Sequence, residues 1–160
     1  MARFVELSRE IFDGMGGINP RYAVRVRPFT THAPDAASRP EQASFEISEV
    51  SFQVPVGTYI DSPRTRDPGG RDIAALGIEE LVSPGLYVDL RGHGGRPHAP
   101  VLPAHLPPPD QLKGRALLLD FGRAESYGTP CYDETPPHLP KATVEALIAA
   151  GVRLLGVDSR

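Results

Sequence analysis

Cysteine, lysine and tryptophan are scarce in this chain of 160 residues. Cys131 is the only cysteine, which excludes an internal disulfide and a cysteine metal cluster. Lys113 and Lys141 are the only lysines, tryptophan is absent, and the formal net charge is −3. This charge balance provides no basic surface for nucleic acid or anionic lipid. We therefore expect no nucleic-acid partner.

Long apolar runs are also missing. No segment approaches the ~18 consecutive apolar residues that a membrane span requires. The first residues, Met1–Glu6, lack the apolar core of a signal peptide. We therefore expect a cytoplasmic protein without a membrane partner. The length and the hydrophobic fraction of 40 % favour one domain over residues 1–160.

The apolar patterns predict an α/β fold. Alternation over residues 22–28 indicates a strand ended by Pro28, and residues 44–54 alternate with a slip between Ile47 and Val50 that indicates a bulge or tight turn. Further strands are predicted at 86–90, 115–122 and 152–158, with helices at 78–82 and 141–150. The strand at 115–122, the last helix and the last strand are expected to form a right-handed β-α-β crossover. We therefore expect a mixed sheet with short helices.

Three histidines fall within a segment rich in proline and glycine, residues 91–109. His93, His98 and His105 invite a metal hypothesis, but spacings of five and seven do not place two ligands on one helix turn or one strand face. The prolines and glycines also disfavour a regular helix or strand that could hold the three histidines in place. An exposed loop is therefore the favoured interpretation.

The stretch from Val54 to Arg66 is the most informative part of the chain. An expected strand ends here and feeds a loop that contains Gly57, Asp61 and Pro63, and such loops often carry the chemistry of α/β proteins. On an extended segment, Tyr59 and Asp61 would point to the same side. They could bind a small polar ligand together, or they could satisfy each other's hydrogen bonds.

This stretch resembles the motif of the metal-dependent cyclase family, which includes bacterial kynurenine formamidase. The motif is H-x-G-T-H-x-D-x-P-x-H, and Gly57, Thr58, Asp61 and Pro63 match it without a gap. Its three histidine positions are held by Pro55, Tyr59 and Thr65. The resemblance extends to the ending of the chain, where residues 147–159 are similar to the family's "L...gvkliGiDt.S.D" segment.

The resemblance implies a β/β/α fold of the cyclase type and binding residues among Gly57, Thr58, Tyr59, Asp61 and Pro63. It also implies that Asp61 is the surviving motif ligand for a metal. Family members continue for several strands and a helix beyond this point, so we expect this chain to lack that C-terminal part. One carboxylate is a poor match for a catalytic site that needs about three protein ligands.

Two functions follow from the resemblance, and enzymatic activity stays open between them. The first is a protein that has lost the metal-dependent hydrolase activity and acts as a binding or partner subunit, as a homo-oligomer and without a cofactor. The alternative is an active amide hydrolase of the arylformamidase type, which converts N-formylkynurenine to kynurenine in tryptophan catabolism. It would need zinc or manganese and ligands from elsewhere or from another subunit. A truncated gene product without an independent role is the third possibility.

Overall fold

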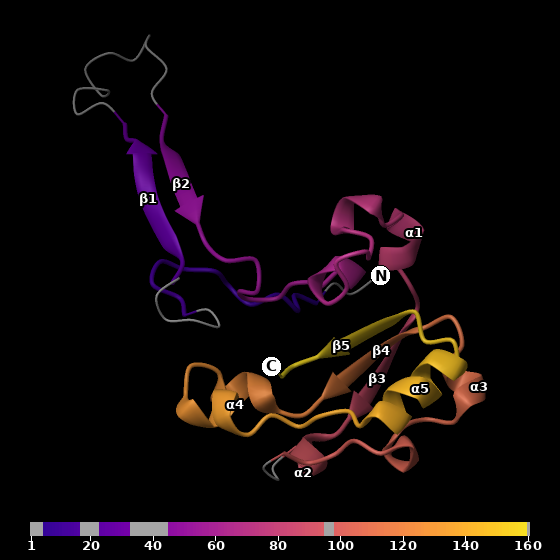
Figure 1. Cartoon of the computed structure of the whole chain (residues 1–160). Helices are drawn as coiled ribbons and strands as arrows, with labels where there is room; N and C mark the ends of the chain where they lie inside the picture. Colours follow the sequence, from indigo (N-terminus) through magenta and orange to yellow (C-terminus); the bar gives the residue numbers. More distant parts are fainter. Residues whose placement is uncertain (1–4, 17–22, 33–44, 95–97, 160) are drawn as a thin grey trace. The chain divides into compact units, whose positions relative to one another are not determined.

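The computed structural model describes residues 5–16, 23–32, 45–94 and 98–159 (Figure 1). The chain divides into two compact units, residues 1–61 and 62–160, and each unit is described by itself. The single domain expected over residues 1–160 stays a prediction. Tyr22 and Ser44, where two predicted strands begin, lie outside the described residues.

The first unit contains an antiparallel ribbon of two strands, β1 (Arg25–Thr30) and β2 (Ile47–Ser51). Both strands were predicted, but with different details. The pairing shifts register between Pro28 and Thr30, so the irregularity lies in β1 and not between Ile47 and Val50. Pro28 lies inside β1 and does not end it. A proline is tolerated there because the ribbon has only edge strands.

Three apolar residues are buried in the described part of the first unit, Met15, Val24 and Val56. The backbone of residue 15 accepts a hydrogen bond from the N–H of Val24 at 2.9 Å, and the N–H of Gly14 donates to the carbonyl of Val24 at 2.9 Å. These bonds tie the N-terminal segment to the start of the ribbon.

The second unit is built on a parallel sheet of three strands in the order β3-β4-β5. The strands are β3 (Gly85–Asp89), β4 (Ala116–Asp120) and β5 (Leu154–Val157). Helix α5 (Lys141–Ala149) connects β4 to its parallel neighbour β5, which confirms the predicted β-α-β crossover. It follows a proline at residue 140 and precedes Gly151, whose φ of 75° ends the helical run. The α/β fold class is confirmed, with the antiparallel and parallel pairings in separate sheets.

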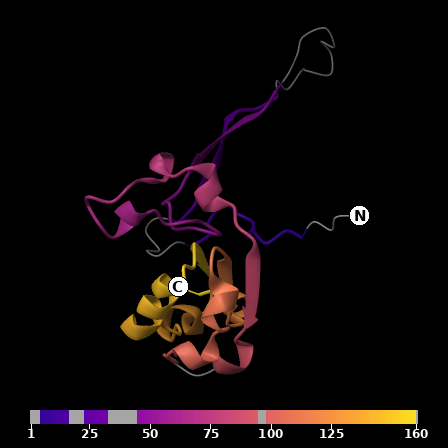
Figure 2. The ribbon, with the colours of Figure 1, turned by 90° about the vertical axis from the view of Figure 1, so that its right-hand side faces the viewer.

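The remaining helices are short. They are α1 (Ile78–Leu81), α2 (Arg91–Gly94), α3 (Pro109–Leu112) and α4 (Pro130–Glu134), with 3-10 helices η3 (Pro63–Thr65), η4 (Ile73–Ala75), η5 (Pro103–His105) and η6 (Arg123–Ser126). No helix in the described part of the chain is long and apolar enough to cross a membrane. The side view in Figure 2 shows the helices of the second unit that are coloured orange to yellow beside its sheet.

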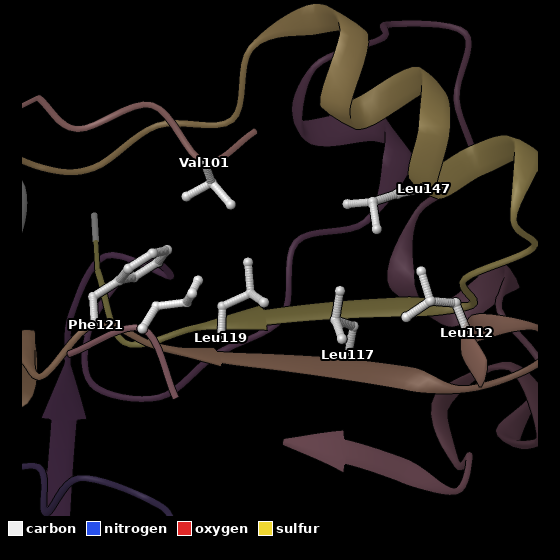
Figure 3. Packing of buried hydrophobic residues seen from close by; sticks show 7 residues of the cluster. Val101, Leu112, Leu117, Leu119, Phe121 and Leu147 are labelled. Carbon is white, nitrogen blue, oxygen red and sulfur yellow. The ribbon is translucent and has the colours of Figure 1, made fainter. Parts of the chain in front are cut away.

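The hydrophobic core of the second unit lies between the sheet and α5 (Figure 3). Leu117 and Leu119 point from the central strand toward Leu147 of α5. Val101, fully buried, contributes to the same core from the segment 91–109. The expectation that this whole segment is an exposed loop was therefore wrong, because its prolines start short helical turns and its valine is apolar enough to be buried.

Candidate functional site

The motif stretch lies in irregular backbone after β2, as the sequence predicted. Gly57 has a φ of 65°, and a Cβ atom at this position would lie 3.2 Å from Cγ1 of Ile11. The positive φ favours glycine here, and a side chain at this position would also require Ile11 to shift by a few tenths of an ångström. The hydroxyl of Thr58 accepts a hydrogen bond from the N–H of Arg9 at 3.1 Å. Thr58 thus ties the loop to the N-terminal segment, which passes close to Gly57.

Tyr59 and Asp61 are the polar side chains that this loop presents. Tyr59 is 48 % exposed and Asp61 is exposed as well. No hydrogen bond joins the two side chains, and Tyr59 makes none elsewhere within the described ranges. Their predicted shared face stays a prediction. Pro63 belongs to the second unit, where it starts η3.

The donor set of this loop does not fit a catalytic metal. A zinc site of the hydrolytic type uses about three protein ligands, with nitrogen or carboxylate oxygen donors at close range. Pro55 offers no side-chain donor, and the neutral phenol of Tyr59 is a weak ligand. Across residues 5–16, 23–32, 45–94 and 98–159, no group of three or more His, Cys, Asp or Glu side chains is placed to hold a metal ion.

The histidines of residues 91–109 do not repair this deficit. The rings of His93 and His105 are in contact, with centroids 4.3 Å apart. However, Nδ1 of His105 accepts a hydrogen bond from the N–H of Leu102 at 3.0 Å, so its proton resides on Nε2. Neither nitrogen of that ring has a free lone pair for a metal. His98 is exposed and has a φ of 52°.

A second polar cluster lies where the parallel strands end. Asp89 and Asp120 end β3 and β4 as directly paired neighbours, and Asp158 follows β5. The hydroxyl of Tyr87 donates to Oδ2 of Asp120 at 2.6 Å. Arg91 places Nε 2.9 Å from Oδ1 of Asp89 and 3.8 Å from Oδ2 of Asp120. The carboxyl ends of parallel strands are the usual place for a binding site in α/β folds.

The hydrogen bonds of this cluster set its charges. The bonds from Arg91 lower the pKa of Asp89 to about 2. The hydroxyl of Tyr87 lowers the pKa of Asp120, and the same bond raises the pKa of Tyr87. Asp89 and Asp120 are therefore ionised at neutral pH, and the Arg91 guanidinium, whose pKa is raised by Asp89, offsets one of the two charges.

Asp158 has a structural task at the same edge. Its carboxylate accepts hydrogen bonds from the N–H groups of Phe121 at 2.7 Å, Arg123 at 2.6 Å and Ala124 at 3.3 Å. Gly122, with a φ of 70°, gives the backbone the turn that aims these donors at one carboxylate. The bonds tie the end of β5 to the segment that follows β4.

This cluster was missed by the analysis of the sequence. Asp89 and Asp120 were placed within predicted strands and Asp158 at the end of one, and their meeting at one edge was not inferred. The signal was present, because three apolar runs end in Val-Asp, Leu-Asp and Val-Asp, and a predicted crossover makes the last two strands parallel.

Comparison with known proteins gives a consistent family. The family model Cyclase, described as "Putative cyclase", matches residues 5–160. Kynurenine formamidase of Bacillus cereus is 26 % identical over 121 residues, which cover 76 % of this chain and 54 % of that protein. Kynurenine formamidase of Delftia acidovorans is 27 % identical over 116 residues, covering 71 % of this chain and 51 % of that protein.

A solved structure supports the fold. A crystal structure described as a novel cyclase has a TM-score of 0.59 with 18 % identity and covers 95 % of this chain and 62 % of its own. At this identity the likeness concerns the fold alone. The chain spans about half the length of the curated relatives that it matches.

Proposed function

Since the chain belongs to the Cyclase family, we propose that it is a family member that binds a small polar ligand at Tyr59 and Asp61 without metal-dependent hydrolysis. The observation that carries this proposal is the donor set of the motif. Proline, tyrosine and threonine hold the three histidine positions at residues 55, 59 and 65. The family motif implies a metal, and this loop retains one of the motif's ligands, Asp61.

The ligand chemistry follows from the two side chains. A phenol donates a hydrogen bond and a carboxylate accepts one, so together they complement a group that has both an acceptor and a donor. An amide is such a group, because its carbonyl oxygen accepts from the phenol of Tyr59 and its N–H donates to Asp61. The proposed ligand is therefore an amide-bearing small molecule. The exposure of both side chains supports this assignment.

Titration calorimetry with N-formylkynurenine, run beside an absorbance assay for its hydrolysis, tests the proposal. We expect heat of binding without hydrolysis. Tyr59→Phe removes one hydrogen bond, and Asp61→Asn replaces the charged acceptor with a neutral amide oxygen. Each should weaken binding about fivefold, which corresponds to ~1 kcal/mol. Asp67→Asn, at an exposed turn, is the matched control and should bind normally. Absence of binding, or equal binding by all variants, would contradict the proposal.

The alternative is an active amide hydrolase of the arylformamidase type, which requires zinc or manganese. The names of the relatives from Bacillus cereus and Delftia acidovorans favour it. On this alternative, ligands come from elsewhere in the chain or from another subunit, and His105 is not among them because its ring has no lone pair to offer. Hydrolysis of N-formylkynurenine that stops when a chelator is added would establish this reading.

A role as a homo-oligomer or partner subunit is part of the same proposal. The outer strand β5 supports it, because its apolar residues Leu155 and Val157 are 42 % and 44 % exposed. An open edge strand with apolar side chains favours association. Sedimentation velocity of the purified chain measures this directly, and a monomer at all concentrations would refute the oligomer.

A further inference from the structure

Two histidines bind the peptide groups on either side of one core residue. Nε2 of His93 lies 2.8 Å from the carbonyl oxygen of Pro100, and the N–H of Leu102 donates to Nδ1 of His105 at 3.0 Å. Pro100 and Leu102 are the chain neighbours of Val101, which is fully buried. The two imidazole rings meet with centroids 4.3 Å apart and planes tilted by 53°.

Val101 is the point where this segment is anchored in the core. Its N–H donates to the carbonyl of His138 at 2.9 Å, and its carbonyl accepts from the hydroxyl of Thr143 at 2.7 Å. Thr143 is itself fully buried at the start of α5. The histidine contacts therefore hold the backbone on both sides of Val101, the residue that joins this segment to the core, to α5 and to residue 138.

The hydrogen bonds determine the protonation of the rings. A carbonyl oxygen can only accept, so Nε2 of His93 carries a proton. A backbone N–H can only donate, so Nδ1 of His105 carries none, and this ring is neutral in the structure. Uptake of a proton at Nδ1 would turn the bond to Leu102 into a contact between two N–H groups. It would also place a positive charge beside the ring of His93.

Neither imidazole takes part in an ion pair within the part of the chain that the structure describes. On the neighbouring elements, Arg91 engages Asp89, and Lys141 pairs with Glu145 on α5, which packs against η5. The other titratable groups on adjoining segments are His98, Asp110 and His138.

We propose that His93 and His105 form an acid-sensitive latch that holds residues 99–105 on the core while His105 is neutral. Protonation of His105 removes the Leu102 bond and places a positive charge beside the ring of His93, which releases the segment. The geometry determines the direction of the pH dependence, because the closed form requires an unprotonated Nδ1 on His105. The latch is therefore closed at neutral pH and opens as the pH falls through the range in which imidazoles take up protons.

Amide hydrogen exchange measured by NMR at about pH 7.5 and about pH 5.5 tests the latch. After correction for the intrinsic pH dependence, we expect exchange at Leu102 to be about fivefold or more faster at the lower pH, relative to Leu119 in β4. Leu119 reports global unfolding, so the ratio isolates local opening. An unchanged ratio would overturn the proposal.

Two variants separate the latch from a general acid effect. His105→Asn retains an acceptor near the position of Nδ1 but does not titrate, so Leu102 should stay protected at both pH values. His98→Asn, at an exposed position, should behave as the natural chain does. If His105→Asn does not fold, the nitrogen chemical shifts of the natural chain decide. A proton on Nδ1 of His105 at neutral pH would refute the latch, and its absence would support it.

Discussion

The hydroxyl of Tyr87, on β3, donates a 2.6 Å hydrogen bond to Asp120 at the end of the neighbouring strand β4. The bond raises the pKa of Tyr87, because loss of the phenolic proton would leave two anions in contact. Replacement of Asp120 by asparagine removes the carboxylate charge. In Asp120→Asn, we expect the pKa of Tyr87 to fall toward the ordinary tyrosine value.

Ultraviolet absorbance during alkaline titration measures this change. Tyr87→Phe in the natural background identifies the transition that belongs to Tyr87. Asp110→Asn, on the exposed turn of α3, is the matched control and should leave the titration unchanged. An identical tyrosine titration in Asp120→Asn and the natural chain would show that the pair is not formed.

The ion pair between Arg71 and Glu80 predicts a dependence of stability on acid. Two hydrogen bonds of 2.8 and 2.7 Å join the guanidinium to the carboxylate and, with the N–H of Gly77, lower the pKa of Glu80 to about 2. Because the folded pKa lies below the ordinary value, the pair stabilises the fold above about pH 4.5 and this contribution is lost toward about pH 2.

Urea denaturation of Glu80→Gln and the natural chain across this range tests the dependence. The variant should be the less stable at neutral pH, and the two proteins should converge as the pH approaches 2. Glu79→Gln, at the neighbouring exposed position, should follow the natural chain throughout. A difference between Glu80→Gln and the natural chain that is the same at every pH would contradict the assignment.

Two adjacent residues of α5, Leu147 and Ile148, should differ strongly in how much they contribute to stability. Leu147 is 5 % exposed and packs in the core, whereas Ile148 is 71 % exposed. Leu147→Ala should lower the free energy of unfolding by about 2–5 kcal/mol, because it leaves a cavity among packed side chains. Ile148→Ala should change it by less than about 0.5 kcal/mol. Equal losses in both variants, measured by chemical denaturation, would show that the helix faces the sheet differently.

Asp158 should stabilise the fold because its carboxylate accepts hydrogen bonds from three backbone N–H groups. Asp158→Ala leaves the N–H groups of Phe121 and Arg123 without an acceptor, and we expect a loss of about 1–3 kcal/mol in the free energy of unfolding. Asp110→Ala, at an exposed position of α3, serves as the control. A loss no larger in Asp158→Ala than in the control would indicate that water replaces the carboxylate without cost.

Much of the second unit could be predicted from the sequence, because local patterns determine it. The run Leu117–Leu119 is apolar on both faces and became the central strand, and Lys141–Ala149 lies between a proline and Gly151 that delimit it. By contrast, the burial of Val101 and its contact with Thr143 depend on residues 42 positions apart. No periodic pattern in the proline-rich segment signals such a contact.

In the candidate site, too, local features could be predicted from the sequence and tertiary contacts could not. Gly57 could be predicted to lie in a loop after a strand, whereas its φ of 65° became known only from the structure. The meeting of Asp89, Asp120 and Asp158 at one edge required the strand order, which the sequence gives for only one of the two neighbouring pairs. The pairing of His93 with His105 depends on the path of the segment between them and is likewise a tertiary result.

The metal content of the purified chain tests the central claim most directly. Elemental analysis should find no zinc or manganese above background in the natural chain or in Asp61→Ala, because the loop offers one ligand where about three are needed. About one metal ion per chain, lost in Asp61→Ala and retained in Asp67→Ala, would contradict the account and establish a metal site in the motif loop.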